Sequence, residues 1–428
     1  MIINIIINSD DDFRPDHVDQ TIELNNAKAF SYTFWQKKDR YPEWYDTKAI
    51  DLLYIALAVF AADRSLLRID AKDGWCREIE LHIPVLNYDI FSDNGELIDS
   101  ILNYLTGDKW HIVFRPRDYN DLEIKHRDRK ARKDKPEKQY DKICMFSGGM
   151  DSFIGAVDLL ETCTDKNTLF VSHYGGGKGV KEYQDALINA FRNEYSLEQR
   201  DFCQFYAKAV DGKEDTTRSR SFMFFAHAIA IASAMAKQIE LIIPENGLIS
   251  LNIPMTYSRI GSSSTRTTHP YYMNKLQILL DNLGLNIKLK NPYQFMTKGE
   301  MLLECKNQGF MIKNIGNTMS CSHPDVGRNR GERETMHCGY CLPCVIRQSA
   351  LKHANVKDNC FYYDREFMKV KEAKTIYNSY KLGVSAFDPQ YAFMTIQQNG
   401  ALDYNIDEYA SLYVRGMKEL KDYLDEIE

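Results

Sequence analysis

The chain has 428 residues, of which 44% are hydrophobic and 27% charged, and its formal net charge is −6. This composition is typical of a globular protein with two or three domains and a large core. The acidic balance argues against a surface that coats nucleic acid generally, although it leaves room for a local basic patch. Ten cysteines without secretory features predict reduced thiols and a cytoplasmic location.

Residues 1–124 alternate strand-like and helix-like segments and are predicted to form an N-terminal α+β domain. The apolar run at 2–7 lacks a basic n-region and a cleavage site, so it is predicted as a first strand and not as a signal peptide. No apolar run reaches transmembrane length, so no membrane contact is expected. Helices are expected at 47–67 and 96–105, and strands at 76–84 and 109–114.

A charged segment follows at 125–140 and is interpreted as a solvated linker between domains. The alternative is a basic arm that holds the phosphates of a nucleic acid or nucleotide, with Arg127, Arg129 and Lys130 among its charges. Acidic residues are interspersed with these basic ones and weaken the alternative. Nucleic acid is therefore a partner that the sequence allows but does not favour.

Residues 141–355 alternate short apolar strands with longer helices, which predicts an α/β fold with a parallel sheet and helices on both faces. Strands are expected at 143–146, 168–172, 202–207, 240–243 and 287–289, and helices at 181–194, 219–236 and 272–283. Ligands of such sheets bind at the carboxyl ends of the strands, so the segments after Phe146, Ser172 and Ile243 are expected along one edge. Residues 356–428 are expected to form a helical extension that packs on the core or on a partner.

The most informative segment lies between the strand expected at 143–146 and a helical pattern. It consists of Phe146, Ser147, Gly148, Gly149, Met150, Asp151 and Ser152. Free N–H groups at a helix start point at an anion, and the helix dipole favours negative charge there. The glycines let the backbone come close, the serines add hydroxyl donors, and Asp151 can cap the helix or hold a metal-bound water. The alternative is a Gly-Gly turn that only joins strand to helix.

Two common phosphate motifs are absent from the sequence, namely the Gly-x4-Gly-Lys-Ser/Thr of the usual P-loop and the Gly-x-Gly-x-x-Gly dinucleotide fingerprint. Ser-Gly-Gly-x-Asp-Ser after a strand instead resembles the pyrophosphate loop of the PP-loop family of ATP pyrophosphatases. The resemblance implies that ATP is cleaved to AMP and pyrophosphate while a carbonyl oxygen is adenylated. ATP and Mg²⁺ are the cofactors expected at this loop.

A cysteine cluster gives the second chemical signal. Cys321 is followed by Cys338, Cys341 and Cys344, and two residues separate each neighbouring pair of the last three. Four thiolates on closely spaced turns suit tetrahedral Zn²⁺, and a site closed by four sulfurs would pin the loop and bind no substrate. His323 and His337 are alternatives for one ligand, and an iron–sulfur cluster or unligated thiols are alternatives to zinc.

The loop at 147–152, the cysteine cluster and Arg347 just after it together resemble the QueC family of 7-cyano-7-deazaguanine synthases. Two further segments resemble that family, one at 292–300 around Lys298 and one at 218–222. The resemblance covers residues 140–355. The added N-terminal and C-terminal regions resemble the QatC group, the QueC-like members of bacterial Qat antiviral defence operons.

The resemblance implies that a 7-deazaguanine carboxylate is adenylated by ATP and then forms an amide with an amine of an operon-encoded partner protein. The alternative is synthesis of the nitrile, for which a second ATP dehydrates the amide. In either case Asp151, Lys298 and Arg218 are expected to be catalytic, with Arg220 as an alternative to Arg218. The positively charged side chains among them can offset charge on the phosphates. For Lys298 the alternative is a surface lysine at a helix start.

Tyr174, Glu245, Asn246 and Arg266 are expected to bind the substrate, and the alternative for Asn246 is a helix cap. The sequence departs from the QueC pattern at 176–178 and at 263–270, where only Arg266 persists from a base-binding segment. Both departures fall on the acceptor side, so the ATP half of the site is expected to be retained. A nucleotide-sensing or scaffold subunit and a nucleic-acid modifier are the two alternatives of a different functional class.

Overall fold

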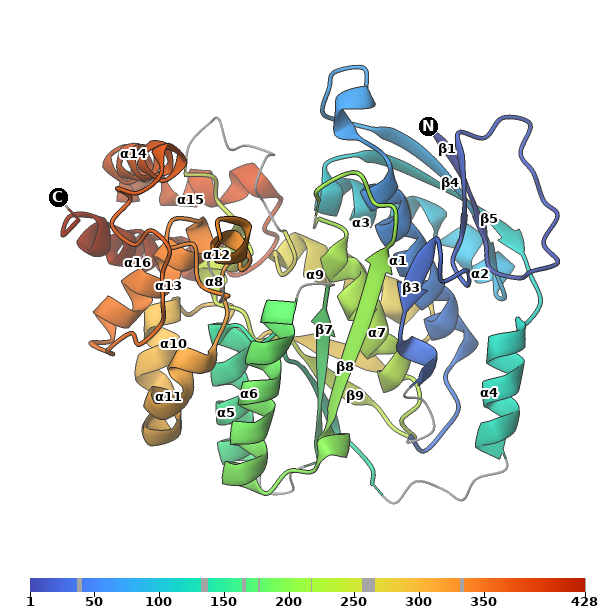
Figure 1. Cartoon of the computed structure of the whole chain (residues 1–428), viewed down its shortest axis with the longest axis horizontal. Helices are drawn as coiled ribbons and strands as arrows, with labels where there is room; N and C mark the ends of the chain where they lie inside the picture. Colours follow the sequence, from blue (N-terminus) through green and yellow to red (C-terminus); the bar gives the residue numbers. More distant parts are fainter. Residues whose placement is uncertain are drawn as a thin grey trace.

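The computed structural model describes residues 1–36, 41–131, 138–163, 167–175, 178–216, 218–255, 266–331 and 335–427. Two sheets lie side by side, with the C-terminal helices at the far end from the N-terminal sheet (Figure 1). Every strand pair but one is parallel. The expected α/β fold class is therefore confirmed.

The central sheet has six strands in the order β10-β9-β6-β7-β8-β3. Its parallel strands are β6 (Lys142–Met145), β7 (Thr168–Tyr174), β8 (Phe202–Ala209), β9 (Ile239–Ile242) and β10 (Ile287–Lys290). All five agree with the expected strands within a few residues. The sixth, β3 (Phe30–Tyr32), comes from the N-terminal region and pairs antiparallel with β8.

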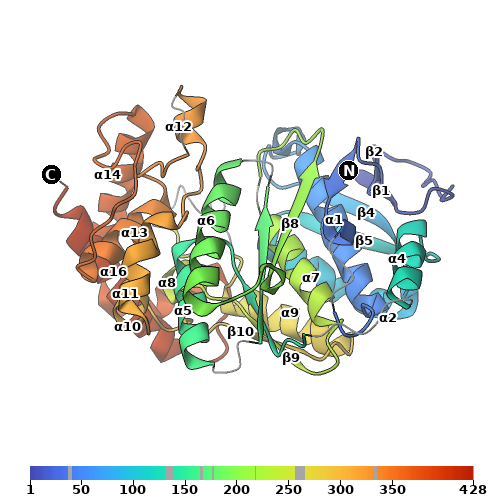
Figure 2. The ribbon, with the colours of Figure 1, turned by 60° about the horizontal axis from the view of Figure 1, so that its bottom comes forward.

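Helices cover both faces of the central sheet (Figure 2). One face carries α5 (Met150–Thr162), α6 (Lys178–Tyr195), α10 (Lys298–Glu304) and α11 (Gln308–Asn314), and the other carries α7 (Arg220–Ala232) and α9 (Pro270–Asn282). The alternation along β6 explains the two layers, because Ile143 and Met145 join one apolar cluster while Cys144 and Phe146 join the other. A sheet buried on both faces is what its continuous apolar strands predict.

The N-terminal sheet has four parallel strands in the order β2-β1-β4-β5. They are β1 (Ile2–Ile6), β2 (Gln20–Glu23), β4 (Glu78–Val85) and β5 (Lys109–Pro116), with helices α2 (Tyr88–Asp93) and α3 (Gly95–Thr106). The helix α1 (Thr47–Ser65) is buried without interruption from Ala49 to Asp63 and packs on α7 and β8 as well as on β4. Because α1 is apolar on all sides, it fits between the two sheets, and one core joins them.

The segment interpreted as a charged linker over 125–140 begins inside a helix, α4 (Asp121–Ala131). One face of α4 is anchored, since buried His126 stacks on Trp35 at 5.8 Å and Lys130 donates to the backbone oxygen of Tyr41. Arg127 lies over the ring of Tyr119. The polar sequence hides this narrow buried face, which is why the pattern predicted no helix there. Residues 132–137 lie outside the described part.

The C-terminal extension packs on the core, which is one of its two expected positions. It contains α14 (Lys371–Ser385), α15 (Ala392–Thr395) and α16 (Ile406–Leu424), next to α8 (Gly247–Leu251), α12 (Val326–Asn329) and α13 (Leu342–His353). The helix α16 contacts α13 and α8. Within the described ranges, no helix combines the length and apolar character needed to cross a bilayer.

A buried ion network ties the two sheets together. Arg77, just before β4, pairs with Asp63 of α1 and, at 2.6 Å, with Asp108 just before β5. Arg68 adds a second cation at 2.7 Å from Asp108. Ser219, just before α7, donates its hydroxyl to Asp63 at 2.6 Å. The network therefore joins α1 and the N-terminal strands to the start of α7.

Replacing Arg77 by alanine is expected to destabilise the protein by about 3–5 kcal/mol, because buried Asp63 and Asp108 would both lose the arginine that pairs with them. The shift of the urea unfolding midpoint measures this effect. The matched control is Lys109→Ala, whose exposed pair with Glu78 is expected to contribute little. Equal shifts for the two variants would contradict the proposed importance of the buried network.

Candidate nucleotide site and cysteine cluster

The candidate site lies where the strand order of the central sheet reverses. From β6 the chain proceeds outward through β7 and β8, and then returns to place β9 on the other side of β6. The loop at 147–152 follows β6, and Pro244, Glu245 and Asn246 follow β9. These two segments therefore flank the crevice in which open α/β sheets bind ligands.

The loop after β6 has the backbone geometry of an anion cradle. Gly148 has φ +87°, and a Cβ there would lie 2.9 Å from Cγ of Gln184, so both conformation and space require glycine. The N–H of Gly148 donates to Ser152 Oγ at 3.2 Å, and that of Gly149 to Ser147 Oγ at 3.3 Å. Ser147 is exposed. The two amides therefore donate to the hydroxyls of the loop's own serines.

The start of α5 is capped from a segment far away in the sequence. Its N-cap residue, Gly149, has no side chain to offer, and the N–H of Met150 donates to Ser320 Oγ at 3.1 Å. The N–H of Met319 donates to the Gly148 oxygen at 2.8 Å. Sequence reasoning missed Ser320, because the only signal for it was a helix start that lacks its own cap.

Asp151 and Lys298, both expected to be catalytic, form a buried ion pair below the loop. The Lys298 ammonium lies 3.0 Å from Asp151 Oδ1, and the two residues are 4% and 5% exposed. Asp151 Oδ2 accepts from Nδ2 of Asn246 at 2.7 Å. Lys298 is therefore not the surface lysine of the alternative interpretation. An ion pair removed from water in this way needs such additional hydrogen bonds.

Glu245 gives this pair an unusual charge state. Burial by itself would raise the pKa of Asp151, but the Lys298 charge and the hydrogen bonds from Glu245 and Asn246 lower it. Burial, followed by the Asp151 charge, raises the pKa of Glu245 well above its usual range. The raised pKa favours the protonated form of Glu245, and the lowered pKa favours the carboxylate form of Asp151.

The helix that carries Lys298 is fixed at its first turn. Thr297 and Glu300 form a capping box, with hydrogen bonds of 3.1 and 2.8 Å. The Thr297 hydroxyl also donates to the Glu419 carboxylate of α16. A Cβ at Gly299 would lie 2.7 Å from that carboxylate. The C-terminal helix therefore helps to position Lys298, and no local sequence pattern marks Glu419 for this role.

The described contacts of Arg218 and Arg266 lie at the N-terminal elements. Arg218 donates to the Thr106 oxygen at 2.7 Å and lies over the ring of Trp75, and Arg266 donates to the Tyr104 oxygen at 2.8 Å. Their catalytic and substrate-binding roles stay predictions.

Asn246 caps α8 through a 3.0 Å bond from the Ile249 N–H, which confirms the cap that was the alternative for this residue. Tyr174 is half-buried against Tyr206. The departures at 176–177 and 263–265 lie outside the described residues.

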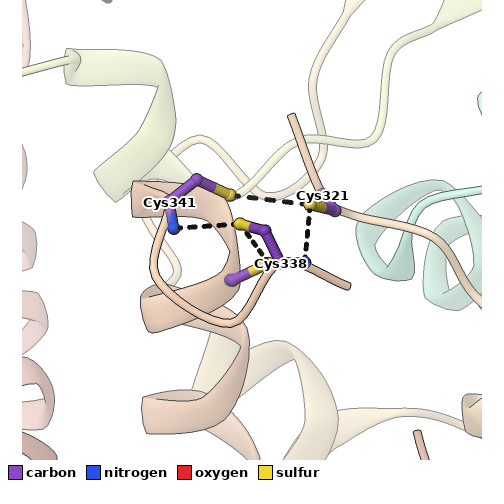
Figure 3. Close-up of side chains that lie close together, drawn as sticks. Cys321, Cys338 and Cys341 are labelled. Atoms are coloured by element: carbon purple, nitrogen blue, oxygen red, sulfur yellow. Dashed lines mark hydrogen bonds between the residues drawn. The ribbon is translucent and has the colours of Figure 1, made fainter. Parts of the chain in front are cut away.

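The four cysteines of the expected cluster come together. Their sulfur atoms all lie within 4.8 Å of one another, with 3.9 Å between those of Cys338 and Cys344. Figure 3 shows Cys321, Cys338 and Cys341, and the sulfurs of Cys321 and Cys341 are also 3.9 Å apart. Tetrahedral zinc with bonds of about 2.3 Å separates its sulfurs by about 3.8 Å. The donor set and spacing therefore fit zinc with four sulfur ligands. The His337 Nε2 lies 3.1 Å from the Thr318 oxygen.

The loop that carries the cluster is tied to the loop at 147–152, at which phosphate is expected to bind and which is called the phosphate loop below. Gly339 has φ +94°, and a Cβ there would lie 2.3 Å from the Asp364 oxygen, so glycine is required. Buried Arg347 donates to Thr318 Oγ1 at 2.5 Å and to the Ile315 oxygen at 3.0 Å. It thus holds the start of the segment that reaches the phosphate loop through Met319 and Ser320.

A family model described as queuosine biosynthesis protein QueC matches residues 267–355. The matched part contains Lys298, the four clustered cysteines and Arg347, and it does not include the loop at 147–152. The match supports a QueC-like relationship for this chain. A comparison with curated proteins gave no match.

The purified protein is expected to carry about one zinc ion per chain, because the four sulfurs are already spaced for it. Cys344→Ser is expected to lose that ion, whereas Cys76→Ser, which changes a thiol of the N-terminal region, should keep it. Elemental mass spectrometry measures the metal content. Equal zinc content in the two variants, or iron with visible absorbance in the wild type, would contradict a four-sulfur zinc site.

The raised pKa of Glu245 is expected to make stability depend on pH. The raised pKa gives stability that is fully present below the unfolded value of about 4.3 and is lost as pH rises through the folded-state value. Glu245→Gln keeps a neutral donor, so it should gain stability relative to the wild type between pH 5 and pH 9. Urea unfolding at pH 5 and pH 9 measures the difference in stability between Glu245→Gln and the wild type. If that difference is the same at both pH values, the pKa of Glu245 is not raised and the prediction is contradicted.

Proposed function

We propose that this chain uses ATP to adenylate a 7-deazaguanine carboxylate and then transfers the acyl group to an amine of a partner protein, in bacterial antiviral defence. In the first step a carboxylate oxygen attacks the α-phosphorus and pyrophosphate leaves with the bonding electrons. In the second step the amine nitrogen attacks the acyl carbon, AMP leaves, and the nitrogen loses a proton to give the amide.

One observation carries the ATP half of this proposal. Met319 and Ser320, which lie in the part of the chain that matches QueC, make hydrogen bonds with Gly148 and Met150 of the phosphate loop. The matched segment and the loop therefore belong to one site, although the loop itself lies outside the match. This arrangement supports PP-loop chemistry related to 7-deazaguanine synthesis.

The side chains of this site supply binding and charge. The Ser147 and Ser152 hydroxyls and the amides of Gly148 and Gly149 would hold the phosphates that leave as pyrophosphate. Lys298 would add a positive charge from beneath the loop. Asp151 is already paired with Lys298 and Asn246, so it fits an anchor of that lysine better than a ligand of Mg²⁺. Mg²⁺ would be held by the nucleotide phosphates, whose charge it neutralises.

Transfer of the acyl group to a partner protein is proposed from the altered segments at 176–178 and 263–270. Both segments depart from the QueC pattern on the side where the substrate would bind. Intact-mass spectrometry of the co-expressed operon protein tests it. The proposal expects a mass increase equal to the deazaguanine acyl group when active enzyme, ATP and the acid are present. An unchanged partner mass would exclude conjugation, and conversion of the free acid to its nitrile would favour the synthase instead.

Asp151→Asn is expected to lower pyrophosphate release by about 100-fold or more, because Lys298 would lose the charge that positions it. Asp185→Asn is the matched control, since Asp185 pairs with Lys181 at a half-exposed site on α6. A coupled pyrophosphate assay measures both variants. Wild-type rates in Asp151→Asn would contradict the proposed role of the buried pair, and ATP binding without turnover under any substrate would favour a sensing subunit.

A further inference from the structure

An arginine with no acidic partner among the described side chains lies at the strand end next to the phosphate loop. Arg220 is the first residue of α7 and is partly buried. Its Nε donates to Nδ1 of His173 at 3.3 Å. Across the ranges that the structure describes, no acidic side chain pairs with its guanidinium, and burial lowers its pKa. A partly buried cation with no acidic partner among the described side chains is stabilised when an anion joins it.

His173 orients this arginine. The imidazole is 2% exposed, and burial, followed by the charge of Arg220, holds its pKa well below the usual range. His173 is thus neutral, and since Nδ1 accepts from Arg220, its proton is on Nε2. Because Nε of the guanidinium is engaged, the edge formed by its two terminal nitrogens is the one presented to a ligand.

The Arg220–His173 pair is connected to the phosphate loop through Gln184. The side-chain nitrogen of Gln184 donates to the backbone oxygen of Ser147 at 2.9 Å and to that of His173 at 3.1 Å. Strands β6 and β7 are neighbours in the sheet, and Ser172 Oγ donates to the Phe146 oxygen at 2.6 Å. The two strand ends therefore form one rigid platform, with phosphate donors on β6 and the arginine beside β7.

We propose that Arg220, oriented by His173, binds the carboxylate that ATP activates. This inference rests on the proposed function and names the substrate-binding residue of its first step. The terminal nitrogens of a guanidinium match the two oxygens of a planar carboxylate. Lys298 is already neutralised by Asp151, whereas Arg220 has no such partner among the described side chains. A carboxylate held at the end of β7 lies next to the nucleotide, as attack on the α-phosphorus requires.

Calorimetry with the deazaguanine acid and its neutral carboxamide tests this proposal, in the presence of a non-hydrolysable ATP analogue. The wild type is expected to prefer the acid, and Arg220→Gln to bind the acid about 10- to 100-fold more weakly, with unchanged affinity for the amide and the ATP analogue. Arg220→Lys keeps the positive charge but loses the pair of terminal nitrogens, so it should recover only part of the affinity for the acid. His173→Phe, which removes the acceptor that orients the arginine, should weaken acid binding while ATP binding stays the same.

The matched control is Arg200→Gln, which removes a surface arginine paired with Glu198 and is expected to bind the acid like the wild type. Unchanged acid binding in both Arg220 variants would overturn the carboxylate assignment. An equal loss of affinity for the ATP analogue would also overturn it, because that result would place Arg220 at a phosphate. Arg220-dependent acid binding without pyrophosphate release in the wild type would contradict the proposed function alone. Pyrophosphate release with wild-type KM for the acid in Arg220→Gln would contradict the subsite alone.

Discussion

The buried ion pair between Asp151 and Lys298 is the interaction on which the candidate site depends. It joins the first turn of α5, directly after the phosphate loop, to the first turn of α10. Neither group has enough water around it to be stable alone, so the hydrogen bond from the cap residue Asn246 to Asp151 completes the pair. The pair therefore fixes α10 against the start of α5, and the bond from Asn246 to Asp151 joins the two segments that flank the crevice.

Much of the remaining structure supports this arrangement from outside. The cysteine cluster lies next to Ser320, which caps α5, and Arg347 holds the same segment through its hydrogen bond to Thr318. The C-terminal helix α16 contacts the Lys298 turn through Glu419. On the other side of the sheet, α1 and the ion network around Asp63 hold the start of α7, where Arg220 lies. Binding groups on loops thus gain their precision from elements that are distant in the sequence.

The sequence predicted what depends on local pattern. The five parallel strands of the central sheet follow from short apolar runs, the turn at 147–149 between β6 and α5 follows from its glycines, and the cluster of four cysteines follows from thiol spacing. The contacts of Ser320, Gln184 and Glu419 could not be predicted, because each depends on a fold that brings remote segments together. The helix at 121–131 was missed because a single narrow face is buried, and the antiparallel β3 because three residues carry too little pattern to predict a strand.

Arg218 and Arg220 also show that contacts between remote segments could not be predicted from the sequence. Arg218 and Arg220 are two residues apart and looked equivalent in the sequence, yet Arg218 turns to Thr106 and Trp75 while Arg220 turns to His173. Side chains two positions apart near a helix start point in different directions, and only the packing of α7 decides which one reaches the strand ends. The choice between them required the structure.

The bond of ATP that the protein cleaves is the most direct test of this account. Wild-type protein would be incubated with the deazaguanine acid, an amine and ATP labelled at the γ-phosphate, and the labelled product would be identified. The account predicts labelled pyrophosphate, because the loop at 147–152 would hold the two phosphates that leave together. Labelled inorganic phosphate as the first product would contradict it, since cleavage would then occur between the β- and γ-phosphates.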